Sequence, residues 1–212
     1  MQDSRISDAV VRRLPKYYRY LSELEAAGIE RVSSSRMSDD MNLNASQIRR
    51  DLNCFGGFGQ QGYGYQVNRL KQEIMKILGI GTSYKAVIVG AGNMGQALLR
   101  YRHFSEEGYH IVAVFDADDS LIGREVGSLT IRPMNELLPF LKDNAVDIGI
   151  IAVPKRHAQK QSDLLVSMGV RGIWNFAPVD VEARKGISVE NVHLSDSLYI
   201  LSYHMRENNE NH

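Results

Sequence analysis

The most informative segment of this chain is Lys85-Ala-Val-Ile-Val-Gly90-Ala91-Gly92-Asn93-Met94-Gly95. Its β-branched first part predicts a buried strand, and its second part, G-x-G-x-x-G, opens a helix expected from Asn93 to Phe104. In such a turn the first glycine permits the bend, the second lets a pyrophosphate approach backbone amides, and the third lets the helix pack on the sheet. The helix N-terminus adds partial positive charge. The segment predicts a dinucleotide-binding turn formed by Gly90, Ala91, Gly92, Asn93, Met94 and Gly95.

A carboxylate at a matching distance strengthens this prediction. A second strand is expected over His110–Phe115, and Asp116 follows it, 21 residues after Gly95. A carboxylate at this spacing can accept hydrogen bonds from the adenosine ribose hydroxyls. Because a 2′-phosphate would meet Asp116 together with Asp118 and Asp119, we expect NADH and NAD+ to be preferred over NADPH and NADP+. The alternative is a glycine-rich turn with an unrelated surface aspartate.

Strands and helices continue to alternate beyond this pair. We expect a buried strand over 146–153, a helix over 155–168 and another strand over 170–176. This alternation predicts an α/β domain with a doubly wound parallel sheet of the Rossmann type. A last helix is expected from Leu194 to His204, with a polar tail from Arg206 that frays. Its apolar stripe needs a surface to cover it and consists of Leu194, Leu198, Leu201 and Met205.

The first eighty residues follow a helical pattern. Apolar residues recur about every 3.6 positions from Ser7 to Ala27, with a kink or restart at Pro15. A second short helix is expected over Arg36–Met41. A third begins after Asn44, which together with Gln47 resembles a capping box.

A stretch rich in glycine and aromatic residues follows the third helix. Residues 56–65 read Gly-Gly-Phe-Gly-Gln-Gln-Gly-Tyr-Gly-Tyr, which suits tight reversals and a short β-hairpin. Three helices followed by such a ribbon predict a winged helix-turn-helix domain over residues 1–80. A helix with one apolar stripe, 67–78, then leads into the Rossmann-type domain over residues 81–212.

Composition is that of an ordinary soluble protein. Of the 212 residues, 43% are hydrophobic and 24% are charged. No apolar run approaches the ~20 residues of a membrane span, and the first thirty residues lack a signal-peptide core, so we expect a cytoplasmic protein without a membrane partner. The net charge is zero, yet residues 1–80 contain 12 Lys and Arg against 9 Asp and Glu. This mild positive excess lies where a nucleic acid would bind.

The third helix offers polar side chains that could contact DNA. In a helix-turn-helix, the first turns of the recognition helix enter the major groove. Arg49 or Arg50 can bind guanine or phosphate, and Ser46 and Gln47 can contact a base edge. The alternative is the solvated face of a small helical bundle. Candidates for minor-groove contacts, unless the aromatics tuck inward, are Phe58, Gln60, Gln61 and Tyr63.

Groups suited to catalysis or metal binding are few. The six histidines form no H-x-H, H-E-x-x-H or paired Cys/His pattern, so we expect neither a metal site nor a catalytic residue. His157 is a candidate base, but an exposed histidine on a polar face is the simpler interpretation. The lone Cys54 is either a reactive thiol near Arg49 and Arg50 or, as we expect, a small filler between the third helix and the ribbon.

Taken together, these features resemble the Rex family of redox-sensing transcriptional repressors over nearly the whole chain. The resemblance implies a repressor, not an enzyme, that binds an inverted-repeat operator in double-stranded DNA and is released by NADH. It also implies a homodimer with a domain-swapped C-terminal helix. The motifs that carry it are Ile48-Arg49-Arg50-Asp51-Leu52, Phe55-Gly56, Gly62-Tyr63-Gly64-Tyr65, Gly90 to Gly95, Ala152-Val153-Pro154, Asn175-Phe176-Ala177-Pro178 and Val189-Glu190-Asn191-Val192.

The resemblance also assigns roles to single residues. It adds Val153 and Pro154 to the cofactor site, and it places the family's interdomain arginine at Arg19 and its nicotinamide-proximal tyrosine at Tyr101. In the family, an acidic residue after the Val-Glu-Asn-Val stretch can link those two positions across the dimer. This chain has His193 there, so the coupling network departs from the family pattern.

The wing departs from the family pattern as well. A basic residue is common where Gln60 and Gln61 stand, so we expect fewer phosphate contacts and a shallower salt dependence. Two other functions are compatible with the residues. One is an NAD-dependent oxidoreductase with an added helical domain. The other is a CoA-binding module on the same fold, which has less need of Asp116.

Overall fold

The computed structural model describes residues 6–56, 59–60 and 63–210. The chain divides into two compact units, Met1–Gly81 and Thr82–His212. Each unit has a hydrophobic core of its own.

The described residues of the first unit form five helices. Pro15 occupies the first turn of the second of these, so the long helical pattern restarts there as predicted. The expected second helix begins two residues earlier than predicted, because Ser33 caps it by accepting a hydrogen bond from the Arg36 amide at 3.1 Å. The helices are α1 Asp8–Val11, α2 Leu14–Ala26, α3 Ser34–Met41, α4 Ala45–Asn53 and α5 Val67–Leu78.

A tight turn joins α3 to α4 and forms a helix-turn-helix. Asn42 has a left-handed backbone, with φ of 52°, and ends α3. The Asn44 side chain caps α4 by accepting hydrogen bonds from the amides of Ser46 at 2.8 Å and Gln47 at 3.3 Å. The reciprocal half of the predicted capping box is wrong, because the Gln47 side chain instead bonds to Asp51 and Arg50.

A small antiparallel sheet forms the wing. Its strands are β1 Arg31–Val32, β2 Gly59–Gln60 and β3 Gly64–Gln66, in the order β1-β3-β2. The expected hairpin is therefore present, but β1 was not expected, since two residues carry no readable alternation. Gly64 has a φ of +69°, and a Cβ there would lie 2.5 Å from the Val32 carbonyl oxygen. Only glycine fits at this position, because the backbone beside it, at Val32 of the paired strand β1, lies so close.

The apolar stripes of the helices meet in one core beneath the wing. The stripe of α2 packs with α3, α4 and α5, as the periodicity predicts. Residues of this core with no exposed surface include Leu14, Tyr17, Leu21, Met37, Ile48, Leu52, Leu70 and Ile74.

The second unit is built on a seven-stranded sheet. The strand order is β10-β9-β8-β4-β5-β7-β6, and among the strands that the structure describes in this sheet only the β6–β7 pair is antiparallel. The order reverses between β4 and β8, which is the switch point of a Rossmann sheet. The strands are β4 Tyr84–Val89, β5 Tyr109–Asp116, β6 Glu125–Val126, β7 Leu129–Pro133, β8 Ile148–Ile151, β9 Gly172–Asn175 and β10 Ser188–Asn191.

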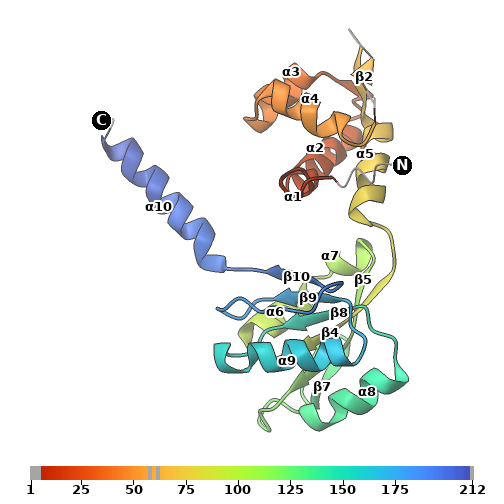
Figure 1. The fold of residues 1–212 in the computed structure, drawn as a ribbon, viewed down its shortest axis with the longest axis vertical. Helices are drawn as coiled ribbons and strands as arrows, with labels where there is room; N and C mark the ends of the chain where they lie inside the picture. Colours follow the sequence, from red (N-terminus) through yellow and green to blue (C-terminus); the bar gives the residue numbers. More distant parts are fainter. Residues whose placement is uncertain (1–5, 57–58, 61–62, 211–212) are drawn as a thin grey trace. The chain divides into compact units, whose positions relative to one another are not determined.

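Helices cover both faces of this sheet. On one face, α8 and α9 pack on side chains such as Val87 and Phe115, and α9 crosses in front of the central strands (Figure 1). On the other, α6 packs on residues such as Ile88 and Ile150. The helical segments are α6 Asn93–Arg100, α7 His103–Glu106, a 3-10 turn at Met134–Glu136, α8 Leu137–Asp143, α9 Lys155–Ser167 and α10 Leu194–Glu210.

Two further helix boundaries expected from the sequence are wrong. The helix expected over 93–104 breaks at Tyr101, whose ψ of 89° is not helical, and resumes as α7. The last helix continues to Glu210, so the tail predicted to fray from Arg206 is helical. Over the described ranges, no helix combines the length and apolar character needed to cross a membrane.

Candidate nucleotide site and DNA interface

Close backbone approaches shape the turn between β4 and α6. Gly90 has a φ of +105°, and a Cβ on it would lie 2.4 Å from the Ala152 carbonyl oxygen. A Cβ on Gly95 would lie only 1.9 Å from the Gly90 carbonyl oxygen. Both glycines are therefore required by packing within the protein, the first against β8 and the second between α6 and the turn.

The middle glycine of the turn differs from the other two. Gly92 is the N-cap of α6, and a Cβ there would meet no protein atom within 4 Å. Asn93 is exposed and Met94 is half-buried in the first turn of the helix. Open space at Gly92, beside the first-turn amides of α6, is what a bound pyrophosphate requires.

Asp116 lies beside this turn, at the end of β5. Its Oδ2 accepts a hydrogen bond from the Ala91 amide at 2.5 Å, and its Oδ1 accepts one from the Asp118 amide at 2.8 Å. These two bonds hold the carboxylate at the carboxyl edge of the sheet. Each carboxylate oxygen retains acceptor capacity for a ribose hydroxyl. The spacing between Gly95 and Asp116 in the sequence thus identified two segments, the glycine-rich turn and the end of β5, that lie side by side in the structure.

Two more acidic groups border Asp116. Asp118 and Asp119 are exposed in the turn that follows β5. Hydrogen bonds from the side chain and backbone of Ser120 lower the pKa of Asp118. Asp118 is therefore an exposed carboxylate two positions after Asp116.

The loop after β8 lies beside the glycine-rich turn. The Ala152 amide donates to the Val89 carbonyl at 2.8 Å, which ties this loop to β4 beside Gly90. Val153 is half-buried, and Pro154 is the exposed N-cap of α9. The structure therefore brings Val153 and Pro154 to the same edge of the sheet as the glycine-rich turn.

The three predicted coupling residues lie on three different elements. Tyr101 is 54% exposed at the far end of α6, with its ring centroid 4.6 Å from that of Phe104. His193 precedes α10, and its Nε2 lies 2.7 Å from Asp180 Oδ1. This hydrogen bond raises the pKa of His193. Arg19 is exposed on α2 in the other unit.

The recognition helix α4 presents two exposed arginines. Arg49 Nη1 donates to Ser34 Oγ and its Nη2 donates to Ser46 Oγ, both at 3.0 Å. Arg50 Nη2 donates to Gln47 Oε1 at 2.9 Å. Of the four candidates on this helix, Ser46, Arg49 and Arg50 are exposed, whereas Gln47 is half-buried.

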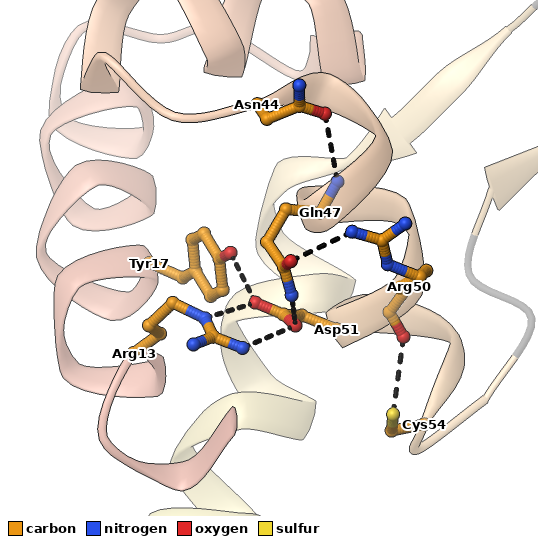
Figure 2. A network of polar contacts seen from close by, with 7 residues as sticks. All are labelled: Arg13, Tyr17, Asn44, Gln47, Arg50, Asp51 and Cys54. Carbon is orange, nitrogen blue, oxygen red and sulfur yellow. Dashed lines mark hydrogen bonds and ion pairs between the residues drawn. The ribbon is translucent and has the colours of Figure 1, made fainter. Parts of the chain in front are cut away.

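A buried aspartate anchors α4 to the start of α2 (Figure 2). Asp51 is 1% exposed and accepts four hydrogen bonds, two from Arg13, one from Tyr17 and one from Gln47. Burial raises its pKa, but the bonds from these partners outweigh burial and leave the pKa of Asp51 below its usual value. Burial and the bond to Asp51 raise the pKa of Tyr17. Sequence reasoning missed this network, because its members lie 34 and 38 residues apart.

The wing exposes one of its candidates. Tyr63 is 71% exposed, whereas Tyr65 is buried in the core, so the inward position expected in the alternative interpretation is wrong for Tyr63. The Arg31 guanidinium lies 6.0 Å from the Tyr63 ring centroid and donates to the Tyr63 carbonyl at 3.2 Å. Gln60 lies in β2, where its backbone pairs with Gly64, and the Phe58 and Gln61 candidates lie outside the described residues.

The two remaining candidates, His157 and Cys54, lie at the surface. His157 is exposed and accepts a hydrogen bond at Nε2 from Arg156 Nε at 3.0 Å. Cys54 is exposed, so it does not fill space between α4 and the ribbon as expected, and its thiol donates to the Arg50 carbonyl at 3.2 Å. Within the residues that the structure describes, no three His, Cys, Asp or Glu side chains are grouped to hold a metal ion.

The two units together define a DNA-binding protein with a dinucleotide-type domain. Family models agree with this class: "Putative DNA-binding protein N-terminus" matches residues 5–53, and "CoA binding domain" matches residues 81–179. The chain is 50% identical over 206 residues to the redox-sensing transcriptional repressor Rex of Clostridium botulinum strain Eklund 17B, covering 97% of this chain and 98% of that protein. The Clostridioides difficile strain 630 protein of the same name is 50% identical over 205 residues, with the same coverage. The chain belongs to the Rex family of redox-sensing transcriptional repressors.

Solved structures of a relative agree with this assignment. The Rex-family repressor RSP, crystallised with β-NAD+ and operator DNA, has a TM-score of 0.89 and 45% identity, covering 96% of this chain and 94% of that one. RSP with β-NADH has a TM-score of 0.89 and 41% identity, covering 97% and 96%. These relatives are named as repressors, which agrees with the expectation that the chain is a transcriptional regulator and not an enzyme.

Proposed function

We propose that this chain represses transcription from an inverted-repeat operator while NAD+ is bound, and that NADH releases it from the DNA. The observation that carries the proposal is the hydrogen bond from the Ala91 amide to Asp116, which sets a ribose-binding carboxylate beside an open phosphate turn. The other unit supplies the DNA interface through exposed Arg49 and Arg50 on a recognition helix.

The nucleotide would lie across the carboxyl edge of β4, β5 and β8. Its pyrophosphate would face the amides around Gly92, where a Cβ meets no protein atom. Its adenosine ribose would face Asp116, and the acidic turn beyond it would disfavour a 2′-phosphate. NADH and NAD+ are therefore the cofactors we assign, held by Gly90, Ala91, Gly92, Asn93, Met94, Gly95, Asp116, Val153 and Pro154.

The DNA would meet α4 and the wing. Arg49 and Arg50 carry fixed positive charge for phosphate or guanine, and Ser46 lies beside them on the exposed face. Exposed Tyr63, backed by Arg31, suits the adjacent minor groove. Phe58, Gln60 and Gln61 remain candidates on sequence grounds.

A homodimer fits both the operator and the surface of α10. Seven large apolar side chains of this helix are each more than half exposed, among them Leu198, Ile200 and Leu201. Burying a side chain of this size contributes about 1.5–3 kcal/mol, so an exchanged helix would be strongly favoured. The surface that would receive it is a hollow of about 370 Å³ on the sheet, with an apolar lining that includes Ala86, Phe104, Ile111, Ile148, Ile150 and Trp174. Two-fold symmetry would match two half-sites of an inverted repeat.

The response to redox state requires two arrangements of the dimer with different affinities for the two ligands. NADH and NAD+ differ by one charge and by the planarity of the nicotinamide ring, and only this difference can shift the equilibrium. We assign the coupling to Arg19, Tyr101 and His193, and we place the protein in the cytoplasm, where it would encounter its operator.

The decisive experiment selects duplexes from a randomised pool on immobilised protein with NAD+ present, followed by elution with NADH and sequencing. An enriched inverted repeat that is released by NADH, and not by further NAD+ or NADPH, supports the proposal. Absence of any enriched sequence contradicts the DNA-binding role and favours an oxidoreductase, which steady-state turnover would detect. Because the matching family model is named for CoA, elution with CoA is the matched control, and release by CoA alone would contradict NADH sensing.

A further inference from the structure

We propose that Gln47 is a positioning residue for DNA binding: buried Asp51 orients its amide, and that amide holds the Arg50 guanidinium on the exposed face of α4. The inference rests on the proposed DNA-binding function and revises the expectation that Gln47 contacts a base. It predicts that the effect of Gln47 on operator affinity passes through Arg50.

The first step is the fixed position of Asp51. Its Oδ2 accepts from Arg13 Nε at 2.6 Å and from the Tyr17 hydroxyl at 2.8 Å, and its Oδ1 accepts from Arg13 Nη2 at 2.8 Å. A carboxylate held by charge-assisted bonds from another helical segment has little freedom to turn. Asp51 is therefore a rigid acceptor in the interior of the unit.

The second step is the orientation of the Gln47 amide. Its Nε2 donates to Asp51 Oδ1 at 2.7 Å, and its Oε1 accepts from Arg50 Nη2 at 2.9 Å. An ionised carboxylate only accepts and a guanidinium only donates. Gln47 lies between the two, so only one orientation of its amide satisfies both neighbours. Figure 2 shows the resulting chain from Arg13 through Asp51 and Gln47 to Arg50.

The third step is the consequence for recognition. Bidentate reading of adenine needs both the oxygen and the nitrogen of a glutamine amide. Here the nitrogen is bonded to a buried carboxylate and the oxygen to an arginine, so reading a base would break bonds that involve charged groups. Arg50 has the opposite character, because it is exposed and its other N–H groups can face DNA. Ordering its side chain before binding lowers the entropy that binding must remove.

The test is a double-mutant cycle on the full-length protein with the labelled inverted-repeat duplex enriched by the wild-type chain. Fluorescence anisotropy measures operator affinity for wild type, Gln47→Ala, Arg50→Ala and the double variant, with NAD+ present. Because residues in one hydrogen-bonded network couple, we expect Gln47→Ala to weaken binding about tenfold in the wild-type background and less than about twofold in the Arg50→Ala background. Gln72→Ala, an exposed glutamine on α5, is the matched control and should leave affinity unchanged.

The cycle separates positioning from a structural role. If Gln47 only stabilised α4, its replacement would cost the same in both backgrounds, and equal losses would overturn the inference. A base-reading role would also overturn it, since Gln47→Ala would then relax preference at one operator position even without Arg50. Failure of the wild-type protein to bind any enriched duplex would instead remove the proposed function itself.

Discussion

The carboxylate of Asp51 and the guanidinium of Arg13 form a two-point ion pair, with Nε 2.6 Å from Oδ2 and Nη2 2.8 Å from Oδ1. The Asp51 side chain is 1% exposed and that of Arg13 is 29% exposed. Since Arg13 is the N-cap of α2, the pair ties the start of one helix to the interior face of another. The recognition helix is thus held by charge-assisted bonds as well as by its apolar side chains.

Replacing Asp51 by Asn should destabilise the first unit by about 2–4 kcal/mol, because the Arg13 charge would lose its buried partner. Hydrogen exchange of peptides from residues 8–78, followed by mass spectrometry, would measure the loss. Asp8→Asn is the control, since its pair with Arg12 is exposed and should contribute little. Equal protection in wild type and Asp51→Asn would show that the pair does not stabilise this unit.

Two glycines in one turn should respond differently to alanine. Gly95→Ala places a Cβ 1.9 Å from the Gly90 carbonyl oxygen, so it should lower both the melting temperature and NADH binding. Gly92→Ala meets no protein atom, so the melting temperature should hold while NADH affinity falls, because the methyl group occupies the approach of the pyrophosphate. Thermal unfolding and NADH fluorescence titration measure the two effects. Unchanged NADH affinity in Gly92→Ala would place the pyrophosphate elsewhere.

Removing the Asp116 carboxylate should weaken discrimination between NADH and NADPH. Asp116→Ala loses the acceptor for the ribose hydroxyls and also the repulsion of a 2′-phosphate, so NADH affinity should fall about tenfold or more while NADPH loses less. Competitive titration gives the ratio of the two affinities. The control is Asp119→Ala, at an exposed neighbour, which should still bind NADH more tightly than NADPH. If the ratio of NADH to NADPH affinity were the same in wild type, Asp116→Ala and Asp119→Ala, the assignment of Asp116 would be refuted.

Charges on α10 should separate the proposed dimer. Leu198 and Leu201 lie three positions apart on one face and are 61% and 53% exposed, so replacing both by Asp should prevent burial of this helix against a second copy. Sedimentation velocity should then report a monomer where the wild type is a dimer. Arg206→Asp changes the charge of the same helix at an exposed position about 110° around the helix axis from Leu198 and Leu201, and this variant should remain dimeric. A dimer in the double variant would assign the interface to another surface.

The pair of His193 and Asp180 should depend on pH. The bond to Asp180 raises the pKa of His193, so the charged pair is complete below the ordinary histidine value of about 6.5 and is lost as pH rises through the higher folded-state value. Asp180→Asn should lower the pKa of His193, which NMR titration of the imidazole measures. Asp196→Asn should lower it less, because Asp196 acts only through its charge. An unchanged pKa in Asp180→Asn would mean that the pair does not form in solution.

Local patterns were sufficient for much of the nucleotide site. The glycine spacing, the strand before it and Asp116 after the next strand are all read within about thirty residues, and the turn brings Ala91 and Asp116 together as expected. The helix restart at Pro15 and the cap at Asn44 are equally local, since each depends on the geometry of a few backbone groups.

Contacts between distant segments were beyond such patterns. The two residues of β1 are a strand only because β3 lies beside them. Tyr63 lies just before β3 and is exposed, whereas Tyr65 lies within β3 and is buried, a difference that alternation along a strand does not predict for residues two positions apart. From the sequence alone, a charged residue such as Asp51 is expected at the surface. It is buried because Arg13, 38 positions away, pairs with it. Helical periodicity and turn propensity act over a few residues, whereas burial and ion pairing depend on which segments meet after folding. The sequence alone therefore established the class of fold and the glycine-rich turn between β4 and α6, and three-dimensional packing determined how the recognition helix and Gln47 are held.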